Sequence, residues 1–213
     1  MKPTAISQSD EEPGPGQTEA CLLTQDDVRQ VFSDSGALMT GHFKLSSGLH
    51  SAEYWEKFWV LQYPQHVERL CKEIARRYAL DNISVVMGPT TGGILLAFEV
   101  ARQLGVRALY AEMEDGKRQF RRGLTLEPGT RTLIVDDVMT TGLALQECIE
   151  LANRHCAEIV GTALLVDRSG GSVDLGYRRE NLLTIETVTY SADACPLCRS
   201  GLPIQKPGTR RLP

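Results

Sequence analysis

The sequence predicts an α/β fold in which a mostly parallel sheet carries helices on both faces. The main observation is that short apolar runs alternate with helical patterns from residue 83 onward, the order typical of βαβ units. The chain has 213 residues, of which 42% are hydrophobic and 23% charged. This is enough to close one core but not two, so we expect one domain with appendages.

The net charge of the chain and the sequence of its N-terminus limit which partners it can bind. A net charge of -4 disfavours a surface that grips a nucleic-acid backbone, so any bound phosphate should belong to a small molecule. No apolar run approaches membrane-spanning length, and Met1, Lys2 and Pro3 are followed by polar residues rather than a secretory pattern. We therefore expect a cytoplasmic protein without a membrane partner. Its six cysteines imply no disulfide framework.

The first segment of the chain divides into a leader and a helix. Residues 1–20 are rich in Ser, Glu, Pro, Gly and Gln and cannot bury apolar area, so we expect a disordered leader. Thr24 and Asp27 have the spacing of a capping box, and an apolar helical face follows before Gly36. We therefore assign residues 21–190 to the domain and residues 191–213 to a C-terminal tail.

The later elements follow from apolar periodicity. Pro64 begins a helical stripe that ends near Asp81. The predicted strands are residues 83–87, 107–111, 132–135 and 158–166, and the predicted helices between them are residues 94–104 and 143–154. The polar stretch 112–129 contains four basic residues and three glycines, which fits a short hairpin or a mobile loop equally well.

The segment 133–142 carries the clearest chemistry. Here an apolar strand is followed by Asp136 and Asp137, then by Thr140, Thr141 and Gly142 at the start of a helix. Ligands bind at the carboxyl ends of parallel strands, and the free N–H groups of a helix start can hold a phosphate. Two carboxylates beside such a site fit ribose hydroxyls and a nearby magnesium ion, so the implied ligand is a ribose 5-phosphate.

A simpler interpretation of this segment is a helix cap or a Walker-B-like magnesium site. The chain contains no Gly-x-x-x-x-Gly-Lys-Ser/Thr, however, so a nucleotide triphosphatase would lack its main part. A double Asp followed by Thr-Thr-Gly is also more than a helix cap needs.

Residues 135–144 resemble the ribose-phosphate-binding motif of type I phosphoribosyltransferases. Three weaker stretches resemble the orotate branch of that family, namely residues 43–51, the Gly-Pro turn at 88–93, and Asp167-Arg168. The match covers about residues 24–190 in the right order. The resemblance implies a parallel-sheet fold with a small N-terminal hood region, transfer of a phosphoribosyl group from phosphoribosyl pyrophosphate to orotate, a role for Mg²⁺, and a homodimer.

The resemblance also assigns roles to residues. Arg168 would pair with the orotate carboxylate, for which a planar guanidinium is well suited, unless it is merely exposed at a strand end. Tyr54 and Trp55 match a base-stacking pair, although they could instead close the core. The substrate-binding residues would be Asp136, Asp137, Val138, Met139, Thr140, Thr141, Gly142, Leu143, Ala144 and Arg168.

The catalytic loop departs from the family pattern. That pattern is Arg-Lys-x-x-Lys-x-His, whereas residues 112–118 read Glu-Met-Glu-Asp-Gly-Lys-Arg and contain no His. Either one of the basic residues Lys117, Arg118, Arg121 and Arg122 supplies the charge for pyrophosphate from a shifted loop, or activity is weak or absent. We take Lys117 and Arg118 as catalytic candidates beside Asp136 and Asp137. Two alternatives stay open: a phosphoribosyltransferase for a purine or uracil, and a non-catalytic regulator that senses phosphoribosyl pyrophosphate.

Four further residues have weaker signals. His50 could donate to pyrophosphate, although a lone loop histidine is more often solvated. Lys57 is a similar candidate whose default is the surface. Cys195 and Cys198 have metal-ligand spacing, but one pair is half of a zinc site, so we expect no bound metal in the monomer, while a dimer could pool two pairs.

Overall fold

The protein is described here by a computed structural model that covers residues 22–45 and 47–206. The predicted leader at residues 1–20 and the last seven residues of the predicted tail lie outside the described residues. Among the residues that the structure covers, no helix combines the length and the apolar character needed to cross a membrane.

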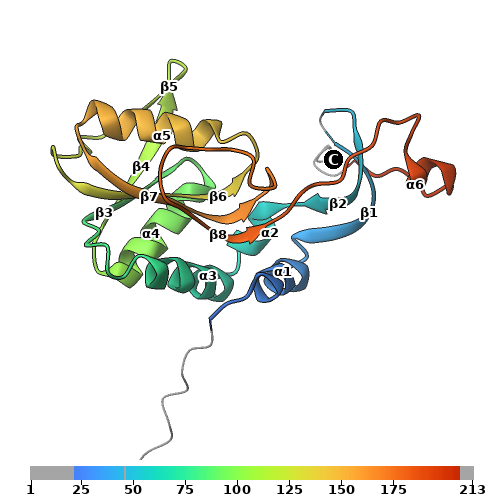
Figure 1. The fold of residues 1–213 in the computed structure, drawn as a ribbon, viewed down its shortest axis with the longest axis horizontal. Helices are drawn as coiled ribbons and strands as arrows, with labels where there is room; N and C mark the ends of the chain where they lie inside the picture. The colour runs from blue at the N-terminus through green and yellow to red at the C-terminus, as the bar shows by residue number, and fades with distance from the viewer. Residues whose placement is uncertain (1–21, 46, 207–213) are drawn as a thin grey trace, which may run out of the picture.

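A six-stranded sheet in the order β5-β4-β3-β6-β7-β8 forms the centre of the molecule (Figure 1). All neighbouring strands run parallel except the β4–β5 pair, which is antiparallel. The strands are β3 (Val85–Pro89), β4 (Arg107–Glu114), β5 (Lys117–Gln119), β6 (Arg131–Met139), β7 (Glu158–Asp167) and β8 (Arg179–Thr184). The predicted α/β fold is confirmed.

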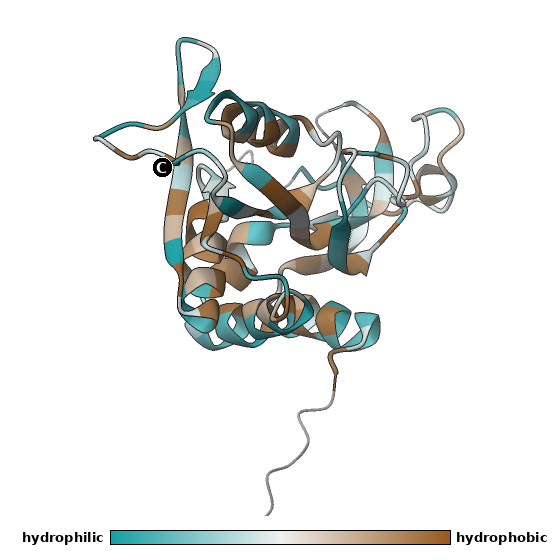
Figure 2. Ribbon diagram, turned by 60° about the vertical axis from the view of Figure 1, so that its left-hand side comes forward, coloured by the Kyte–Doolittle hydropathy of each residue, from teal (hydrophilic) through white to brown (hydrophobic). Residues whose placement is uncertain are grey.

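Helices cover both faces of this sheet (Figure 1). One face carries α3 (Pro64–Arg77) and α4 (Gly92–Leu104), with α1 (Gln25–Asp34) alongside, and the other carries α5 (Leu143–Arg154). Each face has its own buried apolar cluster. In Figure 2 the apolar segments accordingly lie on the strands and on the inner sides of the helices.

The helix ends follow from local sequence signals. Thr24 and Asp27 form the predicted capping box at the start of α1. Pro64 occupies the first turn of α3, where its missing N–H costs nothing. Gly105 ends α4 with a φ of 70°, a left-handed conformation that glycine adopts without strain.

The strand β6 is longer than predicted. We expected it to end at residue 135, before the two carboxylates, but it continues to Met139. The reason is backbone pairing: Asp136 pairs with Leu164 on β7, and the ladder runs on to Met139 opposite Asp167. Asp136 and Asp137 therefore lie on a rigid strand rather than in a loop.

Three other elements were predicted ambiguously from the sequence or not at all. The stretch 112–129 begins as a hairpin, in which Glu112 pairs with Gln119 and Glu114 with Lys117. The strand β8 was not predicted, because its six residues carry only two adjacent leucines between polar neighbours. The five-residue helix α2 (Lys57–Leu61) was also missed.

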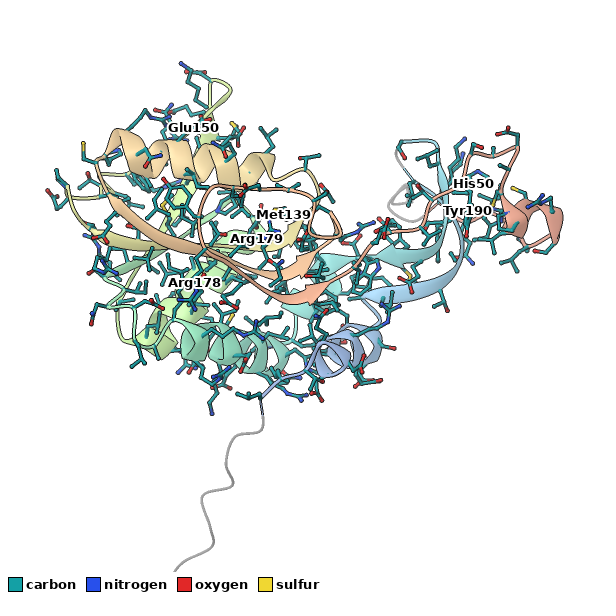
Figure 3. All side chains as sticks on the ribbon, viewed as in Figure 1. His50, Met139, Glu150, Arg178, Arg179 and Tyr190 are labelled. Carbon is teal, nitrogen blue, oxygen red and sulfur yellow. The ribbon has the colours of Figure 1, made fainter. Side chains whose placement is uncertain are left out.

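A second, two-stranded sheet extends from one end of the body. It consists of β1 (Leu38–Lys44) and β2 (His50–Trp55), and together with tail residues 186–206 it forms the region that we call the hood. The tail, which includes α6 (Pro196–Arg199), runs back along the hairpin (Figure 1). His50 and Tyr190 lie side by side where the tail meets β2 (Figure 3).

Candidate active site

The end of β6 and the start of α5 enclose a cavity of about 300 Å³. We call residues 136–144 the cradle. The cavity is lined by Met113, Arg118, Asp136, Val138, Met139, Thr140, Thr141, Gly142, Leu143, Ala144, Leu145 and Glu147. All predicted cradle residues except Asp137 thus line one cavity at the carboxyl end of a parallel strand, where the sheet architecture favours a ligand.

The start of α5 gives the cradle its capacity for anions. Gly142 caps the helix with a φ of 80°, and a Cβ there would lie 2.7 Å from Val173 Cγ1, so no other residue fits without a shift. The first N–H groups of a helix have no partner within the helix and carry partial positive charge. Thr140 and Thr141 are exposed and add hydroxyl donors. A phosphate group suits this arrangement.

Asp136 is a buried carboxyl group, 8% exposed, on the wall of this cavity. One of its oxygens accepts a hydrogen bond from the backbone N–H of Asp137 at 2.8 Å. Burial and the neighbouring Asp137 carboxylate raise the pKa of Asp136 to about 7. A ligand that brings hydroxyl donors or a cation would relieve this repulsion, as ribose and a metal ion do.

Asp137 is buried on the other side of the strand. Its Oδ1 accepts hydrogen bonds from Lys57 Nζ at 2.8 Å and from the Val138 N–H at 2.6 Å. Its Oδ2 is buried and has no hydrogen-bond partner. It lies against the start of α4, where a Cβ on Gly92 would come within 1.8 Å of it. The two carboxylates, adjacent in sequence, therefore have different surroundings.

Lys57 was only a weak candidate in the sequence, and Gly92 was not singled out by itself. Lys57 looked like a surface lysine, but its Nζ holds Asp137 across 80 positions of sequence. Gly92 belongs to the Gly-Pro turn, whose resemblance to the family was noted, yet its contact with Asp137 depends on tertiary packing. No local sequence signal reports either contact.

A second cavity, also of about 300 Å³, adjoins the first. It is lined by Tyr54, Trp55, Glu56, Lys57, Val138, Thr140 and Arg168. Val138 and Thr140 line both cavities, so a ligand in the cradle would reach directly into the second one. This neighbouring space is suited to the group attached to the ribose.

Arg168 supplies positive charge to the second cavity, beside Lys57, whose ammonium group is paired with Asp137. It is half-buried, and its Nε and Nη2 each donate to Thr187 Oγ1 at 3.3 Å. Burial lowers the pKa of its guanidinium, which means that the cation lacks part of the solvation it would have in water. An anionic ligand group would restore that stabilisation. The alternative of an ordinary exposed arginine is wrong.

The two aromatic candidates have separate roles. Trp55 is 7% exposed and packs against Phe32 in the core, with ring centroids 5.4 Å apart. Tyr54 is half-buried at the second cavity, and desolvation raises the pKa of its hydroxyl. The core interpretation therefore holds mainly for Trp55, while Tyr54 is the candidate for contact with a base.

The structure separates the two basic catalytic candidates. Arg118 lines the first cavity with a side chain that is 9% exposed, and it donates to Glu147 at 3.0 Å and to Thr90 Oγ1 at 3.2 Å. Lys117 is exposed and lines a neighbouring surface hollow instead. Arg118 is therefore the better candidate for contact with a ligand in the cradle.

His50 and the cysteine pair lie far from this site, in the hood. His50 is 3% exposed, so the expectation of a solvated histidine is wrong, and this residue lines neither cavity. It lies beside His42, Cys195 and Cys198. The premise that the cysteine pair has no further ligands within the chain is therefore also wrong, because two histidines from the hairpin meet it.

Comparisons with known proteins match this geometry. Residues 60–192 match the phosphoribosyl transferase domain family. The structure of orotate phosphoribosyltransferase from Aeropyrum pernix superposes with a TM-score of 0.62 at 28% identity, over 74% of this chain and 93% of that one. The adenine phosphoribosyltransferase of Trypanosoma brucei, at 14% identity and a TM-score of 0.58, shares the fold. The fold and site thus define a phosphoribosyltransferase.

Sequence relatives narrow this class. Orotate phosphoribosyltransferase from Pelotomaculum thermopropionicum is 48% identical over 89% of this chain and the whole of the relative. The enzyme of the same name from Caldicellulosiruptor bescii is 47% identical over 89% of this chain and all of that protein. The chain belongs to the orotate phosphoribosyltransferase family. These relatives favour an enzyme over a regulator, and the orotate branch over the purine and uracil branches.

Proposed function

We propose that the protein transfers the phosphoribosyl group of phosphoribosyl pyrophosphate to orotate, giving orotidine 5′-phosphate and pyrophosphate. The observation that carries this proposal is the junction of the two cavities at Val138 and Thr140. One cavity offers carboxylates and a helix start to a ribose 5-phosphate, and the other offers a guanidinium to an anionic base. We expect the reaction to occur in the cytoplasm.

The ribose would be held by the acidic pair. Its hydroxyls can donate to Asp136 in the cavity, while Lys57 fixes Asp137 behind it. The 5′-phosphate would accept hydrogen bonds from the start of α5, at Thr140 to Ala144. These contacts bind and orient the sugar, and positioning of this kind supplies much of the rate enhancement.

The chemical step separates charge. A ring nitrogen of orotate forms a bond to C1 of the ribose while the bond from C1 to the pyrophosphate oxygen breaks, and positive charge builds on the sugar in between. The carboxylate of Asp136 can stabilise that charge. Arg118, the cation that lines the cradle cavity, would stabilise the negative charge of the leaving pyrophosphate. Tyr54 would lie against the base.

A magnesium ion fits the chemistry of these residues. Asp136, on the wall of the cradle cavity, is a hard oxygen donor of the kind that Mg²⁺ takes together with substrate phosphates. When bound, the ion would neutralise charge on the pyrophosphate. We propose Asp136 as the residue toward which it binds, while Asp137 lies behind it, paired with Lys57.

We also propose a homodimer. Four large apolar side chains of α2 and α4 are substantially exposed, namely Phe58 at 49%, Trp59 at 42%, Leu95 at 47% and Phe98 at 64%. The two helices contact each other, so these side chains can contribute to one patch of the kind that marks a protein interface. Sedimentation of wild type and of Phe98→Glu tests this: the variant should shift toward monomer, and a wild-type monomer would contradict the proposal.

The catalytic proposal is tested by a panel of bases. Pyrophosphate release is measured with phosphoribosyl pyrophosphate and orotate, uracil, adenine or hypoxanthine, with and without Mg²⁺. We expect turnover with orotate alone, and only when Mg²⁺ is present, because the other three bases lack the carboxylate that Arg168 would bind. Turnover of a purine in preference to orotate would contradict the proposal.

A further inference from the structure

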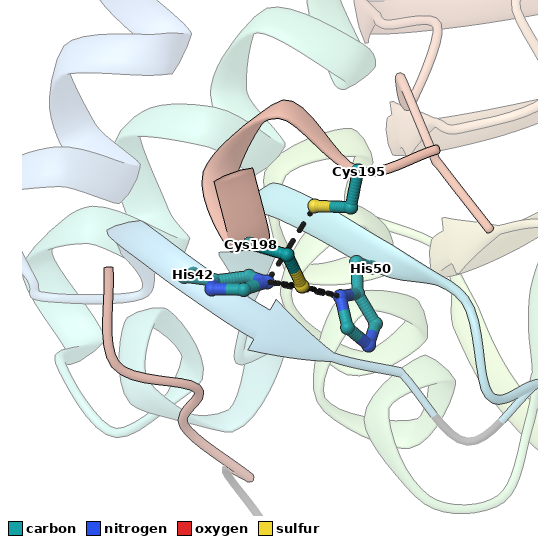
Figure 4. Close-up of side chains that lie close together, drawn as sticks. All are labelled: His42, His50, Cys195 and Cys198. Carbon is teal, nitrogen blue, oxygen red and sulfur yellow. Dashed lines mark hydrogen bonds between the residues drawn. The ribbon is translucent and has the colours of Figure 1, made fainter. Parts of the chain in front are cut away.

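Four side chains from two distant parts of the sequence meet in the hood (Figure 4). His42 lies on β1 and His50 on β2, while Cys195 caps the start of α6 and Cys198 lies within that helix. One nitrogen or sulfur atom of each residue lies within 4.8 Å of the corresponding atoms of the other three. These atoms are His42 Nε2, His50 Nδ1 and the two Sγ atoms.

The distances between these atoms match a tetrahedral zinc site. With Zn–S bonds of about 2.3 Å and Zn–N bonds of about 2.0–2.1 Å, tetrahedral geometry separates a sulfur from a nitrogen by about 3.5 Å and two nitrogens by about 3.3 Å. The observed S···N distances are 3.6 Å, 3.6 Å and 3.3 Å, and the N···N distance is 2.9 Å. A movement of a few tenths of an ångström in the rings would admit the ion.

The hydrogen bonding of His42 favours metal binding. Its Nδ1 lies 2.7 Å from the carbonyl oxygen of Leu202, which can only accept, so Nδ1 carries the proton. In the neutral ring Nε2 then presents a lone pair to the other three groups. A backbone carbonyl that orients a histidine through its second nitrogen is the usual support for a metal-bound imidazole.

Burial and charge also favour an ion here. His42 and Cys195 are 0% exposed and His50 is 3% exposed. Burying this many polar groups is costly unless they are satisfied. Two thiolates would balance the charge of one Zn²⁺, and the mixture of sulfur and imidazole ligands suits zinc better than magnesium or calcium.

We propose that His42, His50, Cys195 and Cys198 bind one zinc ion that joins the tail to the β1–β2 hairpin. Four protein ligands leave no open position, so the ion would be structural and not catalytic. This site does not depend on the proposed function, because it shares no residue with the two cavities.

The zinc site would hold a weakly supported part of the fold. An isolated two-stranded hairpin is marginally stable in water. The tail adds backbone hydrogen bonds at both edges, from His50 N–H to Tyr190 at 2.8 Å and from Gln205 N–H to His42 at 2.7 Å. The metal would lock these contacts. Because β2 continues to Tyr54 at the second cavity, the ion would also steady one wall of the proposed base site.

The test begins with the full chain, purified without a histidine tag and without chelator. Elemental analysis should find one zinc per chain. After the zinc is exchanged for Co²⁺, the protein should show the intense visible bands of tetrahedral cobalt together with thiolate charge transfer. Removing the metal should lower the melting temperature, since metal binding contributes directly to folding.

Matched variants assign the ligands. Cys198→Ser and His42→Asn should lower zinc content by about tenfold or more, because a site with three ligands binds far more weakly. The controls Cys156→Ser and His66→Asn should retain one zinc per chain, since Cys156 is exposed and neither residue belongs to the cluster.

Four results would overturn the proposal. The first is wild-type protein that takes up no stoichiometric zinc when the ion is supplied under reducing conditions. The second is a cobalt spectrum of the weak, octahedral type, which decides the question even if the ligand variants fail to fold. The third is equal loss of zinc from the control variants. Mass spectrometry that finds a Cys195–Cys198 disulfide in protein isolated without oxidant would likewise contradict it.

Discussion

The cradle and the hood hold their functional groups together in different ways. The cradle is one continuous segment, residues 136–144, whose groups are near one another because β6 leads directly into α5. The cluster in the hood joins His42 to Cys195 and Cys198 across more than 150 positions. A site built from one continuous segment can therefore be predicted from the sequence, whereas a cluster formed by distant segments can be recognised only in the folded structure.

The acidic pair offers the strongest test of the cradle. Replacing both Asp136 and Asp137 with Asn should lower turnover by at least about 10³-fold, because this removes the charge on the cradle wall and the charge that Lys57 holds behind it. Stability should change little, since the loss of the Lys57 contact is offset by the loss of repulsion. Steady-state rates and thermal unfolding measure the two effects.

A charge-matched control for that variant is Asp26→Asn with Asp174→Asn, which removes two exposed carboxylates elsewhere. It should keep wild-type activity. Unchanged activity in the Asp136 and Asp137 double variant would show that the cradle is not the ribose site.

Arg168 tests the second cavity, which lies where the cradle meets the end of β2. Arg168→Ala should lower orotate turnover by about 10²-fold, the scale of a lost charge-assisted contact of roughly 3 kcal/mol. The KM for phosphoribosyl pyrophosphate should stay within about twofold of wild type, since the ribose contacts remain. Arg69→Ala, on the exposed side of α3, is the control. If the Arg168→Ala variant turned over orotate as fast as wild type, the orotate carboxylate would have to be bound by another residue.

Arg118 and Lys117 form a natural pair for comparison, because both line the neighbouring surface hollow but only Arg118 also lines the cradle cavity. Arg118→Ala should lower kcat by about tenfold, equivalent to about 1.4 kcal/mol of lost stabilisation of the leaving pyrophosphate. Lys117→Ala should lower it by less than about twofold, as for most exposed side chains. If Lys117→Ala had the larger effect, the hairpin would have to move during the reaction.

The smallest expected effect concerns pH. Burial and Asp137 raise the pKa of Asp136 to about 7, whereas an aspartate in an unfolded chain titrates near 3.9. Between these values the folded protein binds the extra proton, so the free energy of unfolding falls as pH rises from about 4 to about 7 and is then level. The Asp136→Asn variant lacks this pH dependence. Its free energy of unfolding relative to wild type should therefore rise by at least about 1 kcal/mol from pH 5 to pH 8. Urea unfolding at the two pH values measures it, and an equal difference at both would argue against the raised pKa.

Much of the body was predictable because its signals are local. The helix α5 has the predicted bounds, and the capping box of α1 is formed as expected. The cradle followed from the order of Asp136, Thr140 and Gly142 alone. Where predictions failed, backbone pairing decided the outcome, as in β6, whose ladder with β7 continues past the apolar run.

The rest required the fold itself. Lys57 is a lysine among charged and aromatic neighbours, and nothing near it in the sequence indicates that it pairs with Asp137. His50 looked like a loop histidine because its partners come from β1 and from α6. In each case the missing information was which distant segments the chain brings into contact.

Calorimetric titration tests most directly whether the cradle binds the ribose phosphate while Arg168 binds the base. Phosphoribosyl pyrophosphate, and separately orotate in the presence of pyrophosphate, are titrated into wild type, Asp136→Asn and Arg168→Ala. We predict a crossed pattern, in which Asp136→Asn loses at least about tenfold in affinity for phosphoribosyl pyrophosphate and Arg168→Ala loses as much for orotate, each leaving the other ligand nearly unchanged. Equal weakening of both ligands by either substitution would contradict the separation of the two sites.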